Sequence, residues 1–253
     1  MELLIAFVFI LGFIVSILSA VAGIGGGAFY TPVLHFIVGL EMVNALAVAS
    51  SGILVGSLIA SVIYLRRGVA VVRIALPILV GQLISSSIST YLTTVVPKIV
   101  IYIVLAGVLI GNAAKVFLIS IEGDAGDSRR YNMFEFFLLG LFVGFIAPLA
   151  GIGGGAIIVP SLISIYGVDG KIASATSLLV IAVSYVLVTS MHIAFGNMVY
   201  EYAVPLIIGI IIGSVIGTRV HKASKPVYIQ YLVGIIAFIF GVYTIYRLIE
   251  SVI

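Results

Sequence analysis

The residues with the clearest capacity for chemistry form a glycine-rich motif that the chain contains twice. Residues 22–28 read Ala-Gly-Ile-Gly-Gly-Gly-Ala, and residues 150–156 repeat the same seven letters. Each motif opens a short apolar segment, so its turn would present unpaired backbone N–H groups at the positive end of a helix dipole. Such a turn binds an anion without side chains. The candidate binding residues are Gly23, Gly25, Gly26, Gly27, Gly151, Gly153, Gly154 and Gly155.

The alternative interpretation of both motifs is tight packing, because small residues let membrane helices approach closely. A nucleotide-binding loop is excluded, since the motif lacks the preceding soluble strand and the lysine of such loops.

Four hydroxyl residues occupy matching places in the two halves of the chain: Ser50, Ser51, Thr176 and Ser177. A hydroxyl donates to an anion oxygen without carrying charge into the bilayer. The alternative is a bond between helices, or to a carbonyl one turn earlier. Gln82 and Asn112 are isolated amides in apolar segments, for which a polar contact between helices is the expected role.

The residue types that are missing exclude other functions. The chain has no cysteine, and no apolar segment carries a central Asp or Glu, so a relay of buried carboxylates has no members. His35 and His192 have no carboxylate neighbour in sequence with which to form a metal site or a triad. The HExxH and GxSxG motifs are absent. We therefore expect neither an enzyme nor a bound cofactor or metal.

The elements that hold these residues are membrane helices. Of 253 residues, 63% are hydrophobic and 8% charged, and the mean hydropathy is +1.39. Soluble domains carry about 25% charged residues. The apolar runs are continuous, which favours helices over barrel strands.

The net charge of +3 is too small and too dispersed to indicate that the protein binds nucleic acid. Because Met1-Glu2 offers no basic region, we expect a retained first helix rather than a signal peptide. The expected location is the cell membrane, with multiple passes through the lipid bilayer.

The chain is a tandem repeat with an offset of 128 residues. The same offset maps Gly12, Pro32, Gly39, Gly68, Pro77 and Gly81 onto Gly140, Pro160, Gly167, Gly196, Pro205 and Gly209. The first membrane repeat is residues 1–119, a charged cytoplasmic linker follows at 120–133, and the second repeat is 134–253.

Each repeat contains five apolar segments. They are expected at about 3–21, 28–38, 44–64, 71–94 and 98–118, and then at 134–150, 156–166, 172–193, 200–220 and 227–249. The second segment of each repeat has about eleven residues, or about 16 Å of helix, which cannot cross a hydrocarbon core of about 30 Å. The first two segments of each repeat therefore form a lopsided pair or a re-entrant pair, with the glycine motif at its turn.

The basic residues predict how the repeats face the membrane. With the N-terminus outside and the repeats inverted, ten of the 12 Lys and Arg residues lie on the cytoplasmic side: Arg66, Arg67, Arg73, Lys115, Arg129, Arg130, Lys171, Arg219, Lys222 and Lys225. Parallel repeats give at best a seven-to-five split. The positive-inside rule favours inverted repeats with both termini outside, an architecture common among transporters that open alternately to each side.

These features together resemble the TauE/SafE family of sulfite exporters. The resemblance rests on the duplicated glycine motif, the Pro32 and Pro160 that follow it, and the hydroxyl pairs of the third segments. It covers nearly the whole chain. It implies an all-α integral membrane transporter that exports sulfite or an organosulfonate such as sulfoacetate, with the glycine and hydroxyl residues named above as the binding candidates.

Three alternatives remain open at this stage: an anion channel, a transporter of another small anion such as sulfate or thiosulfate, and a structural membrane scaffold. Gly209, Gly213 and Gly217 form a ridge of small residues that is expected to pack against a helix and is compatible with a homodimer. We expect export to be driven mainly by the membrane potential.

The predicted topology can be tested with single cysteines, because the chain has none of its own. We expect Gly126→Cys and Lys222→Cys to react with an impermeant reagent from the cytoplasmic side only. Labelling of these two positions from opposite sides of the membrane would show that the repeats are not inverted.

Overall fold

A computed structural model describes residues 2–118, 132–220, 235 and 238–246. Most of the linker predicted at 120–133, and more than half of the last predicted segment at 227–249, lie outside the described residues.

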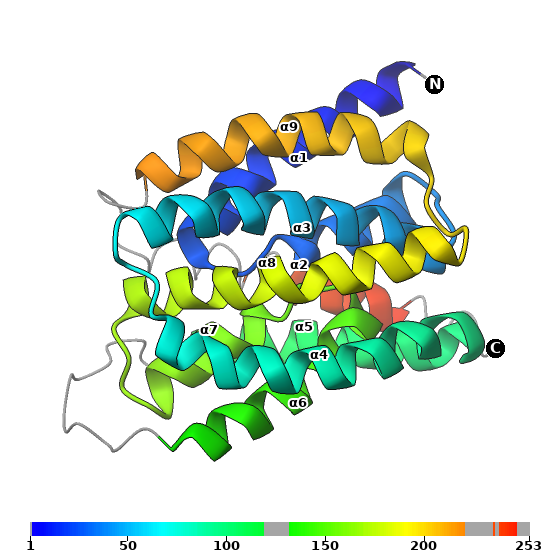
Figure 1. Ribbon diagram of the computed structural model, residues 1–253. Coiled ribbons are helices and arrows are strands. Elements are labelled where there is room, and N and C mark those ends of the chain that lie inside the picture. The colour runs from blue at the N-terminus through cyan, green and yellow to red at the C-terminus, as the bar shows by residue number, and fades with distance from the viewer. Residues whose placement is uncertain (1, 119–131, 221–234, 236–237, 247–253) are drawn as a thin grey trace.

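The described chain is helical and contains no strand, which confirms the predicted all-α fold (Figure 1). The elements are α1 (Glu2–Ala22), α2 (Gly27–Pro32), the π-helix η1 (Val33–Ile37), α3 (Met42–Arg66), α4 (Val72–Val95), α5 (Lys98–Leu118), α6 (Met133–Ala150), α7 (Gly155–Ser164), α8 (Gly170–Ala194) and α9 (Tyr200–Val220). Within the described residues, six helices are long and apolar enough to cross a bilayer: α1, α3, α4, α6, α8 and α9. The chain is a multi-pass membrane protein.

The second segment of each repeat is short, as expected. α2 and η1 together cover residues 27–37, and α7 has 10 residues. The two repeats differ here: after Pro32 the chain widens into a π-helix, in which Val38 N–H donates to Val33 O at 3.1 Å. The equivalent Pro160 lies inside a regular α-helix. The sequence, which has proline at both positions, did not predict this difference.

The two repeats are intertwined rather than side by side. α1 packs most extensively against α9, and α4 against α6. Because α1 and α6 are equivalent, as are α4 and α9, the first long helix of each repeat packs on the fourth segment of the other.

The contacts between the repeats are reciprocal. A Cβ atom at Gly12 would overlap with Leu206 O, and a Cβ atom at Gly140 would overlap with Ile78 O. The offset of 128 residues pairs Gly12 with Gly140 and Ile78 with Leu206. Such an exchange of equivalent contacts is what a two-fold axis between the halves produces.

The small-residue ridges form these close contacts. Cβ atoms at Gly209 and Gly213 would overlap with carbonyl oxygens of α1, and Ser89 of α4 donates a hydrogen bond to Phe145 O of α6 at 2.5 Å. Small residues of this kind let helix backbones approach closely. The ridge on α9 was expected to pack against a helix and was compatible with a homodimer. In the structure α1 of the same chain covers it.

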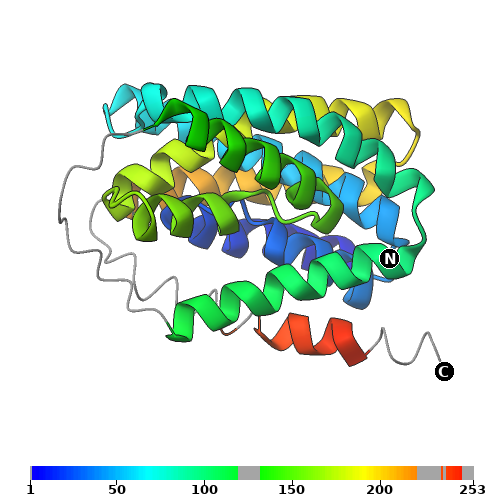
Figure 2. The ribbon, with the colours of Figure 1, turned by 90° about the horizontal axis from the view of Figure 1, so that it is seen from below.

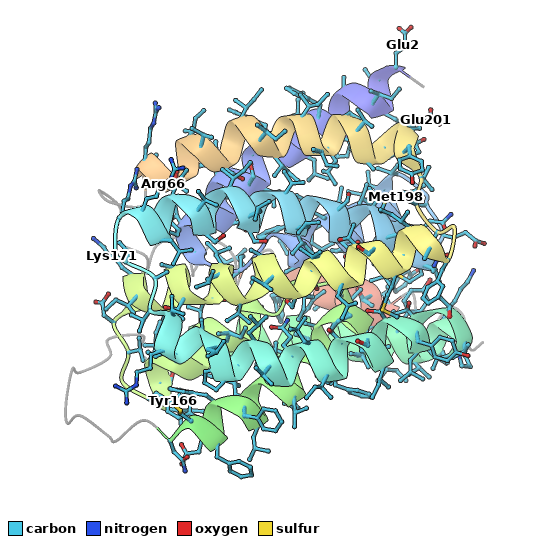
Figure 3. All side chains as sticks on the ribbon, in the orientation of Figure 1. Glu2, Arg66, Tyr166, Lys171, Met198 and Glu201 are labelled. Atoms are coloured by element: carbon cyan, nitrogen blue, oxygen red, sulfur yellow. The ribbon has the colours of Figure 1, made fainter. Side chains whose placement is uncertain are left out.

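Equivalent helices run in opposite directions. Figure 3 shows Arg66, at the end of α3, and Lys171, at the start of α8, at one end of the helices. Met198 and Glu201, which follow α8, lie at the other end. The directions agree with inverted repeats, and the orientation of each repeat across a membrane stays a prediction.

α5 lies along one side of the bundle, next to the helical residues 238–246 (Figure 2). A Cβ atom at Gly241 would lie 2.7 Å from Ile110 Cγ1 of α5. The fifth segments of the two repeats thus pack on each other.

We expect that neither repeat folds alone, because α1 and α6 each find their main packing partner in the other repeat. When residues 1–126 and 127–253 are expressed as two polypeptides, they should co-purify through a tag on one of them, while either piece alone aggregates or is degraded. A single repeat that elutes from size-exclusion chromatography as one sharp, helical species would contradict the intertwined packing.

Candidate anion-binding site

The two glycine motifs adopt the same backbone conformation. The first three of the four glycines in each motif have positive φ: Gly23 (76°), Gly25 (78°) and Gly26 (80°), and Gly151 (64°), Gly153 (85°) and Gly154 (80°). Residues with a Cβ atom adopt this conformation only at a cost, whereas glycine does so freely. Each motif is therefore a sharp turn between a long helix and a short one.

The last glycine of each motif has a different role. A Cβ atom at Gly27 would overlap with Gly151 O and lie 2.7 Å from Ile152 C. One at Gly155 would overlap with Gly23 O and lie 2.6 Å from Ile24 Cα. The two turns thus cross backbone against backbone, and every residue of both is buried. The structure thus brings together two motifs that lie 128 positions apart in the sequence.

Hydroxyl groups join the turns to the opposite repeat. Thr31 Oγ1 donates to Gly151 O at 2.7 Å, Ser177 Oγ to Gly23 O at 3.0 Å, and Ser174 Oγ to Ala22 O at 3.2 Å. These carbonyls lie at the C-terminal ends of α1 and α6, where a helix leaves carbonyls without intrahelical partners. Sequence reasoning missed Thr31 and Ser174, because their partners lie in the other repeat.

The four hydroxyl candidates have protein partners. Ser50 and Ser51 donate to Ala47 O and Val48 O of their own helix, both at 2.7 Å, which is the backbone bonding that the sequence left as an alternative. Thr176 Oγ1 accepts from Val71 N–H at 3.1 Å. Thr176 and Ser177, which bonds to Gly23 O, thus join α8 to the first repeat, whereas Ser50 and Ser51 bond within α3.

The surroundings of the two turns differ. A Cβ atom at Gly26 would lie 2.6 Å from Cε2 of the Tyr30 ring. At the equivalent Gly154, the nearest atoms are Val143 Cγ1 at 2.8 Å and Gln82 Nε2 at 3.3 Å. Next to it, Gly153 N–H donates to the buried Tyr185 hydroxyl at 3.0 Å. An aromatic ring therefore covers the first turn, whereas an amide lies against the second.

Gln82 departs from the role that its sequence position suggested. Its side chain is fully buried on α4, and neither amide atom has a hydrogen-bond partner among the described residues. The expected polar contact between helices is therefore not formed. The sequence does contain a signal for its special position, since the 128-residue offset pairs Gln82 with an apolar residue, Ile210.

The interior around the turns is polar but uncharged. Among the described residues no Asp, Glu, Lys or Arg side chain is buried, and no three His, Asp or Glu side chains gather into a metal site. Glu2, Arg66, Lys171 and Glu201 lie at the ends of the helices (Figure 3). Electrostatic attraction for an anion in the interior must therefore come from backbone and amide dipoles.

α7 is the helix whose N-terminus can supply that attraction. Its N-cap residue is Gly154, without a side-chain cap. The N–H groups of Ile157 and Ile158 donate to Gly154 O at 3.0 and 2.9 Å. The N–H groups of Gly155 and Ala156 have no acceptor in the described part of the chain. Free N–H groups at a helix start favour negative charge.

The chain combines long apolar helices with two glycine turns that interrupt the helices and meet in the protein interior. Secondary transporters are membrane proteins that use interrupted helices of this kind. The sequence profile described as "Sulfite exporter TauE/SafE" matches residues 8–244. The chain belongs to this family of membrane transporters.

Several curated relatives are named probable membrane transporter proteins. One from Methanocaldococcus jannaschii is 27% identical over 256 residues, which cover 95% of each chain. One from a Sinorhizobium species is 26% identical over 235 residues, 92% of this chain and 89% of the relative. With YunE of Bacillus subtilis the identity is 27% over 140 residues, so the match spans 54% of this chain and 51% of that relative. No solved structure matches the chain.

We expect Gly155→Ala to destabilise the protein by about 1–3 kcal/mol, the usual cost of overpacking, because the new methyl group would overlap with Gly23 O. The matched control is Gly107→Ala in α5, where a Cβ atom meets nothing within 4 Å and alanine favours the helix by about 1 kcal/mol. The measurement is the midpoint of heat-induced loss of the monodisperse peak in detergent. Equal midpoints for wild type and Gly155→Ala would show that the turns do not cross closely.

Proposed function

We propose that this membrane transporter exports a small sulfur oxyanion, either sulfite or an organosulfonate such as sulfoacetate. The observation that carries the proposal is the uncapped N-terminus of α7, buried where the two turns cross. Its free N–H groups suit an oxyanion, whose oxygen atoms accept several hydrogen bonds at once. The description of the family as sulfite exporters supports the same class of substrate.

The absence of charged side chains from the described interior affects how tightly an anion is bound and how readily it is released. An anion held by neutral donors does not face a buried lysine or arginine, which would form a strong ion pair with it. Binding by dipoles alone gives moderate affinity, and a carrier must release its substrate on the far side. The absence of buried carboxylates among the described residues also means that no negative side chain repels the anion on its way.

The membrane potential supplies a sufficient driving force for export. The cytoplasm is negative, so an anion that leaves it gains about 2.3 kcal/mol per charge per 100 mV. At about 1.4 kcal/mol per factor of ten, a monovalent anion is held roughly fortyfold lower inside at that potential. Coupling to protons through carboxylates would need buried Asp or Glu side chains, and the described residues include none.

We expect purified protein in liposomes to move radiolabelled sulfite or sulfoacetate when a potassium–valinomycin potential is imposed without a pH or sodium gradient. Flux should saturate with substrate, as expected for a carrier, and sulfate and thiosulfate serve as competing anions. Flux that rises linearly with concentration would favour a channel. If the potential drives no anion movement while a proton gradient alone does, the proposed mode of energisation is wrong.

A further inference from the structure

Gln82 has a buried amide that is unpaired among the described residues, as expected of a residue that binds a ligand in the protein interior. Its amide is fully buried, and both Oε1 and Nε2 lack a partner. Buried polar groups are almost always hydrogen-bonded, because an unpaired one costs folding free energy. A leucine or isoleucine at this position would avoid that cost, as Ile210 does at the equivalent position of the other repeat. The amide therefore serves something other than stability.

The amide and the start of α7 converge on one place. Gln82 Nε2 lies 3.3 Å from where a Cβ atom of Gly154 would stand, and Gly154 is the N-cap of α7. Because residue 154 is glycine, it places no side chain of its own beside the amide, and the free N–H groups of Gly155 and Ala156 follow it directly in the chain. Tyr185 holds the turn in this position by accepting from Gly153 N–H.

The first turn lacks this arrangement. The Tyr30 ring lies against Gly26, and α2 continues as an α-helix for only 6 residues before the π-helix. Ile210, at the position equivalent to Gln82, packs its Cδ1 atom 2.7 Å from the Cβ position of Gly52. An amide donor thus lies against the second turn, and a tyrosine ring lies against the first.

We propose that the transporter has a single oxyanion site at the second turn, in which the Gln82 amide N–H and the N–H groups that open α7 bind the substrate together. This inference rests on the proposed function and names its binding residue. The first turn supports the second through the backbone crossing and contacts no substrate. The repeats have kept a common fold while only one of the two turns binds.

The test compares Gln82→Met with Ile210→Met in the full-length protein. Methionine matches glutamine in length and lacks the donor, and Ile210→Met places the same residue at the equivalent position of the other repeat. The dissociation constant for radiolabelled sulfite is measured on purified protein, with sulfoacetate, sulfate and thiosulfate as further probes. The melting midpoint is measured without any anion.

We expect Gln82→Met to weaken anion binding by about tenfold or more, the scale of a hydrogen bond to a charged group. Without anion, its melting midpoint should equal or exceed that of wild type, because the variant removes an unpaired buried amide. Ile210→Met should bind like wild type.

A fall in the anion-free melting midpoint of Gln82→Met, or an unchanged dissociation constant, would show that Gln82 is structural and overturn the inference. Wild-type binding without transport would refute the proposed export alone. If wild type binds none of the four anions, both the site and the proposed function are wrong.

Discussion

The structure depends on one contact, the crossing of two glycine turns in the interior of the bundle. Each turn places a carbonyl oxygen where a Cβ atom of the other would be: Gly151 O lies against Gly27, and Gly23 O against Gly155. Only glycine permits such an approach, and only glycine readily adopts the positive φ of the adjacent residues. The chain reverses direction in the interior of the bundle at both turns. As a result, α7 begins there with free N–H groups, and the long helices of each repeat pack against the other repeat. Irregular backbone is tolerated there because it is buried in protein.

The crossing also explains why the repeats are intertwined. A long helix that ends in a turn at the centre must pack against helices on both sides of the crossing, so α1 reaches α9 and α6 reaches α4. Glycine and serine ridges on α9 and α4 make room for this packing, and Ser89 adds a hydrogen bond to Phe145 O. In a bilayer, where helices gain no hydrophobic energy by associating, such close packing and hydrogen bonding hold the bundle together.

The sequence predicted the all-α fold and the two glycine turns, and which residues bind an anion stays a prediction. Continuous apolar runs and the duplicated motif were sufficient to place the helices and both turns, because helix length and glycine content are local properties. The partners of the hydroxyls were not predictable in the same way. Ser177 bonds to Gly23, which is 154 positions away, while Ser51 bonds to its own helix, and nothing local distinguishes the two. Gln82 was assigned a contact that it does not make, although its mismatch with Ile210 in the repeat alignment was visible.

That mismatch illustrates a general consequence of duplicated transporters. Secondary transporters built from inverted repeats rock between arrangements that face either side of the membrane. A single small anion at the centre cannot satisfy two complete sets of donors at once, and an unused set would leave buried polar groups unpaired at a cost in stability. An aliphatic side chain in place of the amide, as at Ile210, avoids one such unpaired group while the crossing backbone is kept. Tyr30 at the first turn, and Gln82 at the second turn in place of an aliphatic side chain such as Ile210, correspond to the proposed division between a turn that supports and a turn that binds.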